Sequence, residues 1–167
     1  MVIVLITGSS ASGKTTIAKL LEKHHQFHLI DGDQVIKDLG LTSKSWNSIH
    51  HSLIDRALQF DTDAKVVISH VVLPEKFEYY QDILAKAGRT LKIIVLKPSL
   101  QSLQQRNLVR KSHPKPTPVI VIDFFYQKFL EINPNTRNWF IVDSSLQDSA
   151  ETARQIVDYC GISTTKL

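Results

Sequence analysis

Short apolar runs alternate with longer amphipathic stretches along the whole chain. The runs are rich in Val, Ile and Leu, a pattern typical of strands that are buried on both faces. We expect strands at Val2–Thr7, Phe27–Ile30, Val66–Ser69, Leu91–Leu96 and Trp139–Val142. The stretches between them carry apolar residues at helical spacing. They predict helices at Thr15–His25, Val35–Leu39, Trp46–Phe60, Glu75–Ala87, Leu100–Arg110, Val119–Ile132 and Ala150–Tyr159.

One of these stretches is ambiguous. The Val, Ile, Phe and Tyr content of Val119–Ile132 favours a strand, whereas its length favours a helix, which we predict. Strands that alternate with helices predict an α/β protein with a parallel sheet and helices on both faces. The chain has no repeat, low-complexity segment or linker, so we expect one domain over residues 1–167.

Composition excludes several classes of protein. With 167 residues, of which 43% are hydrophobic and 22% charged, the chain is too apolar to be disordered and can bury a sizeable core. The single cysteine, Cys160, excludes a disulfide scaffold, and no apolar run is long enough to span a membrane. The first residues enter a strand directly, without a basic segment or cleavage site. We therefore expect no signal peptide and a cytoplasmic location.

The net charge of +4 mildly favours anionic partners but does not indicate nucleic acid. The basic residues that do gather are Arg106, Arg110, Lys111, His113 and Lys115. The adjacent pairs His24/His25 and His50/His51 point in different directions on a helix. We therefore expect all four on the solvated surface and none in a metal site.

The strongest motif is Gly8-Ser9-Ser10-Ala11-Ser12-Gly13-Lys14-Thr15, which matches G-x-x-x-x-G-K-[ST] between a buried strand and a helix. Its backbone N–H groups would form an anion site at a helix N-terminus. Lys14 would contact the β- and γ-phosphates, and the Thr15 hydroxyl would be a ligand of Mg²⁺. The nucleotide-binding residues predicted here are Gly8, Ser9, Ser10, Ala11, Ser12, Gly13, Lys14, Thr15 and Thr16.

Asp31-Gly32-Asp33 follows the second predicted strand directly. Because sites in parallel sheets gather at the carboxyl ends of strands, both carboxylates should lie beside the phosphate loop. One could help to hold Mg²⁺ while the other orients and deprotonates an acceptor hydroxyl. The alternative is a simple turn in which Asp33 caps the helix at Gln34–Leu39.

Together with the short chain, these motifs resemble the small P-loop kinases of metabolites, such as shikimate, gluconate and adenylyl-sulfate kinases and chloramphenicol phosphotransferase. The wider group includes nucleoside monophosphate kinases and polynucleotide 5′-hydroxyl kinases. The resemblance implies a three-layer P-loop NTPase fold whose five parallel strands have the order 2-3-1-4-5. It implies that Asp31 supports the metal and that Asp33 is the substrate-binding base.

The sequence departs from these relatives at the end of the third strand, where many of them have an aspartate. Ser69 and His70 stand there instead, so Thr15 and Asp31 should support the metal, with Ser69 as a further candidate. His70 could contact substrate or simply pack at the strand end.

Arg106 and Arg110 share one face of a predicted helix, just before the Pro-rich segment Ser112–Pro118. This is the pattern of a lid, at about residues 110–118, that brings charge to the phosphates when it closes. The resemblance implies that Arg110 binds phosphate, that Arg106 stacks near adenine, and that Ser144 and Ser145 border the base. Alternatively, the two arginines are solvated at the basic end of a helix, and the two serines cap the start of the last helix.

The sequence therefore predicts an ATP-dependent kinase in which Lys14, Asp33 and Arg110 are catalytic. ATP and Mg²⁺ are the expected cofactors, a small molecule with a hydroxyl group is the expected acceptor, and the protein is a monomer or homodimer without a membrane partner. The acceptor should lie near residues 34–60, where His51, Asp55 and Arg56 either face a cleft or are solvated. Two alternatives stay open: a nucleoside, nucleotide or polynucleotide 5′-hydroxyl kinase, and a regulatory ATPase without an acceptor.

Overall fold

A computed structural model describes residues 2–40, 45–110, 115–133, 139–145 and 147–162. Its five strands form one parallel sheet in the order β2-β3-β1-β4-β5, which confirms the predicted fold class and strand order. The strands are β1 (Val2–Gly8), β2 (Phe27–Asp31), β3 (Lys65–Ser69), β4 (Thr90–Leu96) and β5 (Phe140–Val142).

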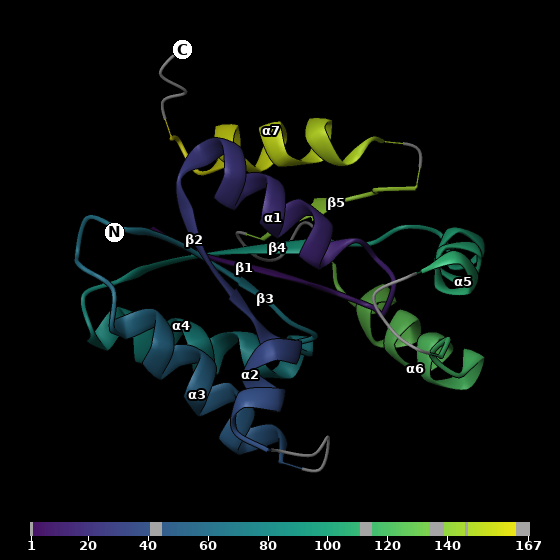
Figure 1. The fold of residues 1–167 in the computed structure, drawn as a ribbon, viewed down its shortest axis with the longest axis horizontal. Helices are drawn as coiled ribbons and strands as arrows, with labels where there is room; N and C mark the ends of the chain where they lie inside the picture. The colour runs from purple at the N-terminus through teal and green to yellow at the C-terminus, as the bar shows by residue number, and fades with distance from the viewer. Residues whose placement is uncertain (1, 41–44, 111–114, 134–138, 146, 163–167) are drawn as a thin grey trace.

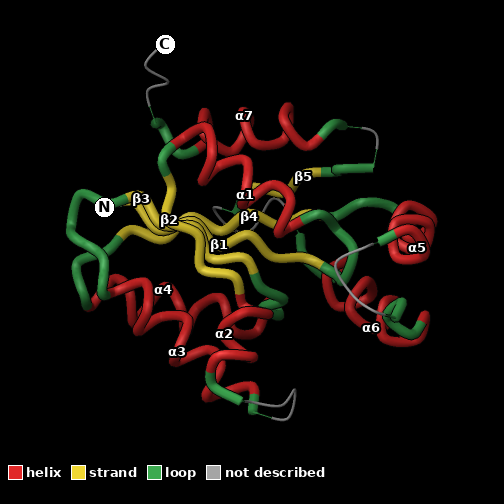
Figure 2. Tube along the Cα trace, viewed as in Figure 1, coloured by secondary structure: helices red, strands yellow, loops and turns green. Residues whose placement is uncertain are grey.

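Helices cover both faces of this sheet, as Figure 1 shows, so the molecule has three layers. Helices α1 and α7 lie on one face and α3 and α4 on the other, while α5 and α6 lie at one end (Figure 2). The ambiguous stretch is a helix, as predicted. The helices are α1 (Lys14–His25), α2 (Gly32–Asp38), α3 (Trp46–Leu58), the 3₁₀ turn η1 (Pro74–Lys76), α4 (Phe77–Lys86), α5 (Leu100–Val109), α6 (Val119–Leu130) and α7 (Ser149–Tyr159).

The central strand β1 supplies both halves of the core. Ile3 and Leu5 pack under α3 and α4, whereas Val4 and Ile6 pack under α1 and α7. All four side chains are completely buried. Because successive residues of a strand point to opposite faces, a strand covered on both sides must be apolar at every position, and this accounts for the continuous apolar run.

The expectation that His50 lies on the surface is wrong. Its side chain is 3% exposed, and its Nδ1 is 2.8 Å from the hydroxyl oxygen of Tyr80. Residues next to each other on a helix are only about 100° apart, so His50 shares the buried face of α3 with Ile49 and Leu53. His24 and His51 are exposed and His25 is half buried. Among the described residues, no group of three or more His, Cys, Asp or Glu could hold a metal ion.

The carboxyl ends of the strands meet along one edge of the sheet. Asp31 at the end of β2 is in register with Ser69 at the end of β3, and Ser69 is in register with Ile6 of β1. The loop after β1 and the segments after β2 and β3 are therefore neighbours. No helix in the described parts of the chain is long and apolar enough to cross a membrane.

Candidate active site

The loop between β1 and α1 has the backbone that its two glycines predict. Gly8 has a φ of 140°, and a Cβ on it would lie 2.3 Å from the carbonyl oxygen of Leu96 in β4. Ala11 has a φ of 63° and Gly13 a φ of 99°, so together with Gly8 three residues have a positive φ before α1 begins. Alternation of this kind turns successive N–H groups toward one side, which makes a concave site for an anion.

Helix α1 begins at this loop without a side-chain cap and without an acidic residue in its first turn. Its first N–H groups therefore remain available to an external acceptor, and the helix dipole favours a negative one. A phosphate group has the charge and the acceptor oxygens that this site requires.

Lys14 folds back over the loop. Its Nζ donates hydrogen bonds to the carbonyl oxygens of Gly8, at 3.0 Å, and Ser9, at 2.8 Å. Burial lowers the pKa of Lys14 to about 8, against the opposing charges of Asp33 and Asp31, while the charge of Arg110 lowers it further. Asp33, Asp31 and Arg110 therefore all lie close enough to Lys14 to act on it electrostatically.

The two carboxylates after β2 differ in their surroundings. The Oδ1 of Asp31 accepts a hydrogen bond of 3.0 Å from the backbone N–H of Asp33, so Asp31 is the N-cap of α2. The simple-turn interpretation assigned this cap to Asp33. The charge of Asp33 acts on both Lys14 and Arg110.

A group of oxygen atoms lies where a magnesium ion is expected. The hydroxyl oxygens of Thr15 and Ser69 are 3.3 Å apart, and Asp31 is paired in register with Ser69. Mg²⁺ prefers oxygen ligands and keeps several waters, so two hydroxyls and one carboxylate fit its chemistry together with nucleotide phosphates.

His70, the residue after β3, is 7% exposed. Burial lowers its pKa to about 4, assisted by His50 and Lys14 and opposed by Asp33. Its backbone N–H donates to the carbonyl oxygen of Ile6, at 3.3 Å. Its Nε2 is buried and has no hydrogen-bond partner among the described residues. His70 is thus a packed, neutral imidazole at the edge of the site.

The arginine of α5 and the loop after β5 are joined across the site. Arg106 donates a hydrogen bond to the carbonyl oxygen of Ser144, and the Ser144 hydroxyl donates to the carbonyl oxygen of Ser12, at 3.3 Å. Ser145 instead accepts a hydrogen bond of 2.7 Å from the backbone N–H of Ser99, outside the cleft. Arg106 and Ser144 are therefore brought to the phosphate loop, and Ser145 is not.

Asn107 is a residue that the sequence did not single out. It is buried on α5, and its side-chain amide makes two hydrogen bonds to the backbone of Thr117, of 2.8 and 2.9 Å. These bonds tie the last part of the Pro-rich segment to α5, just beyond Arg106. Within the predicted lid, residues 111–114 lie outside the described residues, including Lys111 and His113 of the basic cluster.

A cleft of about 530 Å³ runs through this edge of the sheet, a size suited to a nucleotide or a similar ligand. The residues singled out from the sequence that line it are Ser10, Ala11, Ser12, Gly13, Lys14, Thr15, Thr16, Asp31, Asp33, Ser69, His70, Arg106, Arg110 and Ser144. Gly8 and Ser9 lie beneath it, where their carbonyl oxygens accept from Lys14. The acceptor candidates His51, Asp55 and Arg56 do not line it: Arg56 pairs with Asp38 at 3.0 Å, and His51 contacts the hydroxyl of Tyr79.

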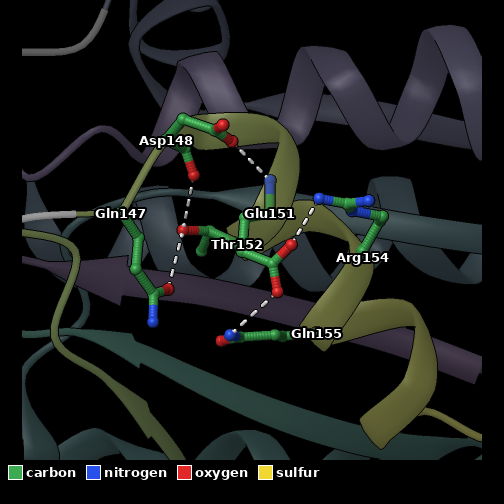
Figure 3. Close-up of polar contacts among 6 residues, drawn as sticks. All are labelled: Gln147, Asp148, Glu151, Thr152, Arg154 and Gln155. Carbon is green, nitrogen blue, oxygen red and sulfur yellow. Dashed lines mark hydrogen bonds and ion pairs between the residues drawn. The ribbon is translucent and has the colours of Figure 1, made fainter.

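One wall of the cleft comes from the start of α7. Gln147, Ser149 and Thr152 line it, and none of the three was predicted. Figure 3 shows how this helix start is held: the Asp148 carboxylate accepts from the backbone N–H of Glu151 at 2.6 Å, and the Thr152 hydroxyl donates to the Asp148 carbonyl oxygen at 3.1 Å. Asp148, rather than Ser144 or Ser145, therefore caps α7.

The chain matches the family described as AAA domain over residues 3–132. This range runs from β1 to just beyond α6 and contains the phosphate loop, both carboxylates and both arginines. No curated protein matches the chain significantly in sequence.

Solved structures match the fold over nearly the whole chain. A gluconokinase from Sinorhizobium meliloti 1021 is similar with a TM-score of 0.72 and 18% identity, covering 95% of this chain and 90% of that one. The APS kinase of Mycobacterium tuberculosis, in complex with AMPPNP and APS, has a TM-score of 0.69 and 20% identity, and the match covers 95% of this chain and 96% of that one. A shikimate kinase from Bacteroides thetaiotaomicron has a TM-score of 0.69 and 18% identity, and the match covers 96% of this chain and 99% of that one. At these identities the likeness establishes the fold.

Proposed function

The chain belongs to the AAA domain family, and from this premise we propose that it is an ATP-dependent kinase that phosphorylates a hydroxyl group of a small molecule. One observation carries the proposal: Lys14, Asp33 and Arg110 line a single cleft and influence one another electrostatically. A cation on the phosphate loop, a carboxylate and a second cation are the groups that phosphoryl transfer to a hydroxyl requires. We treat residues 1–167 as one kinase domain.

The phosphate loop would bind the nucleotide through the N–H groups around Gly13 and at the start of α1. On binding, Lys14 would exchange the carbonyl oxygens of Gly8 and Ser9 for phosphate oxygens. Arg106 and Ser144 lie at the other end of the cleft, where the base would bind. Mg²⁺, held by Thr15 and Asp31 with Ser69 beside them, would neutralise charge on the phosphates.

Asp33 would act on the acceptor. Its carboxylate accepts the proton of the acceptor hydroxyl as that oxygen bonds to the γ-phosphorus, and the bond to the bridging oxygen of ADP breaks. Lys14 and Arg110 stabilise the charge on the transferred group. Two carboxylates with separate tasks favour a kinase over a regulatory ATPase, which requires no base for an acceptor.

The similar structures support this class of reaction, since a gluconokinase, an APS kinase and a shikimate kinase share the fold. The APS kinase structure holds AMPPNP, an ATP analogue, together with APS. ATP and a small acceptor are therefore the ligands that we propose for this chain.

The proposal is tested by measuring ADP formation from Mg·ATP with a panel of sugars, sugar acids, polyols, nucleosides and oligonucleotides with 5′-hydroxyl ends. A kinase forms ADP faster when its acceptor is present, and the phosphorylated acceptor is then detected by mass spectrometry. A response to nucleosides or oligonucleotides would assign the acceptor to those classes. Slow hydrolysis that is unaffected by every acceptor would favour the regulatory ATPase instead.

A further inference from the structure

The glycine between the two carboxylates is in unusually close contact with His70. A Cβ built on Gly32 would lie 2.2 Å from Nδ1, 2.5 Å from Cγ and 2.8 Å from Cβ of His70. Gly32 is the first residue of α2, and its φ is not in the left-handed region. It is therefore required for space, because no larger residue fits between the backbone of α2 and the imidazole ring.

The ring itself has little freedom to move. The backbone of His70 is hydrogen-bonded to Ile6, and the rings of Trp46 and His50 have centroids 6.0 and 6.3 Å from that of His70. The side chain is 7% exposed and also forms part of the cleft wall. The backbone bond and the neighbouring rings restrict its movement, so Gly32 meets a ring that is held in place.

A shift of Gly32 would act on Asp33 more than on Asp31. Asp31 is held on one side by the strand register with Ser69 and on the other by its hydrogen bond to the N–H of Asp33. A shift of Gly32 away from the ring would thus carry Asp33 with it. A displacement of about 1 Å in a catalytic group can cost on the order of 10²-fold in rate.

We propose that His70 is a positioning residue, whose ring supports the backbone of Gly32 and thereby sets the position of Asp33 relative to Lys14. The proposal rests on the proposed function, because it assigns His70 a task within that site. The contribution of His70 is the shape of its ring, applied through the edge that carries Nδ1.

The test is a double-mutant cycle with Gly32→Ala, His70→Ala and the two combined. For each protein, kcat and KM for ATP are measured from Mg·ATP hydrolysis, in which a water molecule takes the place of the acceptor hydroxyl beside Asp33. Stability is measured by urea unfolding. Gly32→Ala should lower kcat on the order of 10²-fold while KM changes less than about threefold, because the phosphate loop is untouched. The combined variant should regain at least about tenfold of that loss, since the new methyl group occupies space left by the ring.

Phe77→Leu is the control, because the ring of Phe77 is fully buried and packs against Trp139, whereas His50 packs against His70 itself. It should lower stability and leave kcat within about twofold. The proposal is overturned when the combined variant is no faster than Gly32→Ala, or when Phe77→Leu loses as much kcat as His70→Ala. If Gly32→Ala is too unstable to purify, the kcat of the combined variant is compared with that of His70→Ala. The proposal is then overturned when the kcat of the combined variant is not higher than that of His70→Ala.

Failure of the proposed function gives a different result. Lys14→Ala would then hydrolyse ATP at the normal rate, whereas coupling between positions 32 and 70 would still be present in the unfolding data. Coupling in stability without coupling in kcat would overturn the positioning role and leave the kinase assignment standing.

Discussion

Acid should destabilise the protein through His50, and the size of the effect follows from its surroundings. Burial lowers the pKa of His50 from an ordinary 6.5 to about 4, assisted by the charges of Lys76 and His51. The unfolded chain therefore binds a proton near pH 6.5, whereas the folded protein does so only near pH 4. The stability that His50 contributes is fully present above pH 6.5 and is lost as the pH falls toward 4.

A pKa that is 6.5 in the unfolded chain and about 4 in the folded protein lowers the free energy of unfolding by about 3 kcal/mol once the pH is below 4. At pH 5 the loss is about 2 kcal/mol. His50→Gln should remove this contribution, because glutamine does not titrate and can still accept a hydrogen bond from the hydroxyl of Tyr80. The pKa of His70 is also lowered to about 4, mainly by burial. That part of its contribution is kept in both proteins, and only the part due to the charge of His50 is lost in the variant.

The assay is urea unfolding of the wild type and His50→Gln at pH 7.5 and pH 5.0, with the slopes checked for equality. The wild type should lose about 2 kcal/mol more than the variant between these two pH values. Equal losses in the two proteins would refute the reasoning, since they would mean that His50 is protonated as readily in the folded protein as in the unfolded chain.

Two further predictions concern the cleft. Asp33→Asn keeps the size of the side chain but removes the base, so turnover should fall while the Kd for ATP, measured by calorimetry, stays within a few-fold. A collapse of ATP affinity with an altered Mg²⁺ requirement would show that Asp31 and Asp33 have exchanged roles. Arg110→Ala should lower kcat far more than it weakens nucleotide binding, because its charge acts mainly on the transition state. A normal rate, with equal protease sensitivity of residues 112–118 with and without AMPPNP and acceptor, would mean that the basic cluster is only surface.

The fold was predictable because its signals are local. An uninterrupted apolar run such as that of β1 can only be a strand covered on both sides, and the phosphate-loop motif fixes how β1 leads into α1. The strand order came from resemblance and is confirmed, since alternation alone does not specify which strands are neighbours. Helix α6 shows the limit of prediction from local signals. Its composition suits either a strand or a helix, and only its length indicated the helix that the structure has.

The position of a site residue was predictable where the residue belongs to a sequence motif. It was less predictable where contacts between distant parts of the chain determine the position of the side chain. Lys14 and Asp33 come together because the carboxyl ends of β1 and β2 lie at one edge of the sheet. Ser145 was chosen for its place after β5, but its hydroxyl is used by the N–H of Ser99, from a segment far away in sequence. His50 was judged from its polar neighbour His51, although the packing of α3 buries it against Tyr80.

The contact between Gly32 and His70 had no sequence signal at all. A glycine between two aspartates is typical of a turn, and the structure instead assigns it to a helix start where a distant ring leaves no room for a Cβ. Asn107 was missed for the same reason, since its two hydrogen bonds to Thr117 depend on how α5 meets the segment that follows it.

The central claim is that this cleft transfers the γ-phosphoryl group of ATP, and Lys14 tests it most directly. The measurement is the acceptor-dependent rate of ADP formation by the wild type and by purified Lys14→Ala, with circular dichroism as the check that the variant is folded. Because Lys14 is the cation seated on the phosphate loop, its removal should lower the rate on the order of 10²-fold or more. A folded Lys14→Ala protein with a near-normal rate would contradict the assignment of phosphoryl transfer to this site.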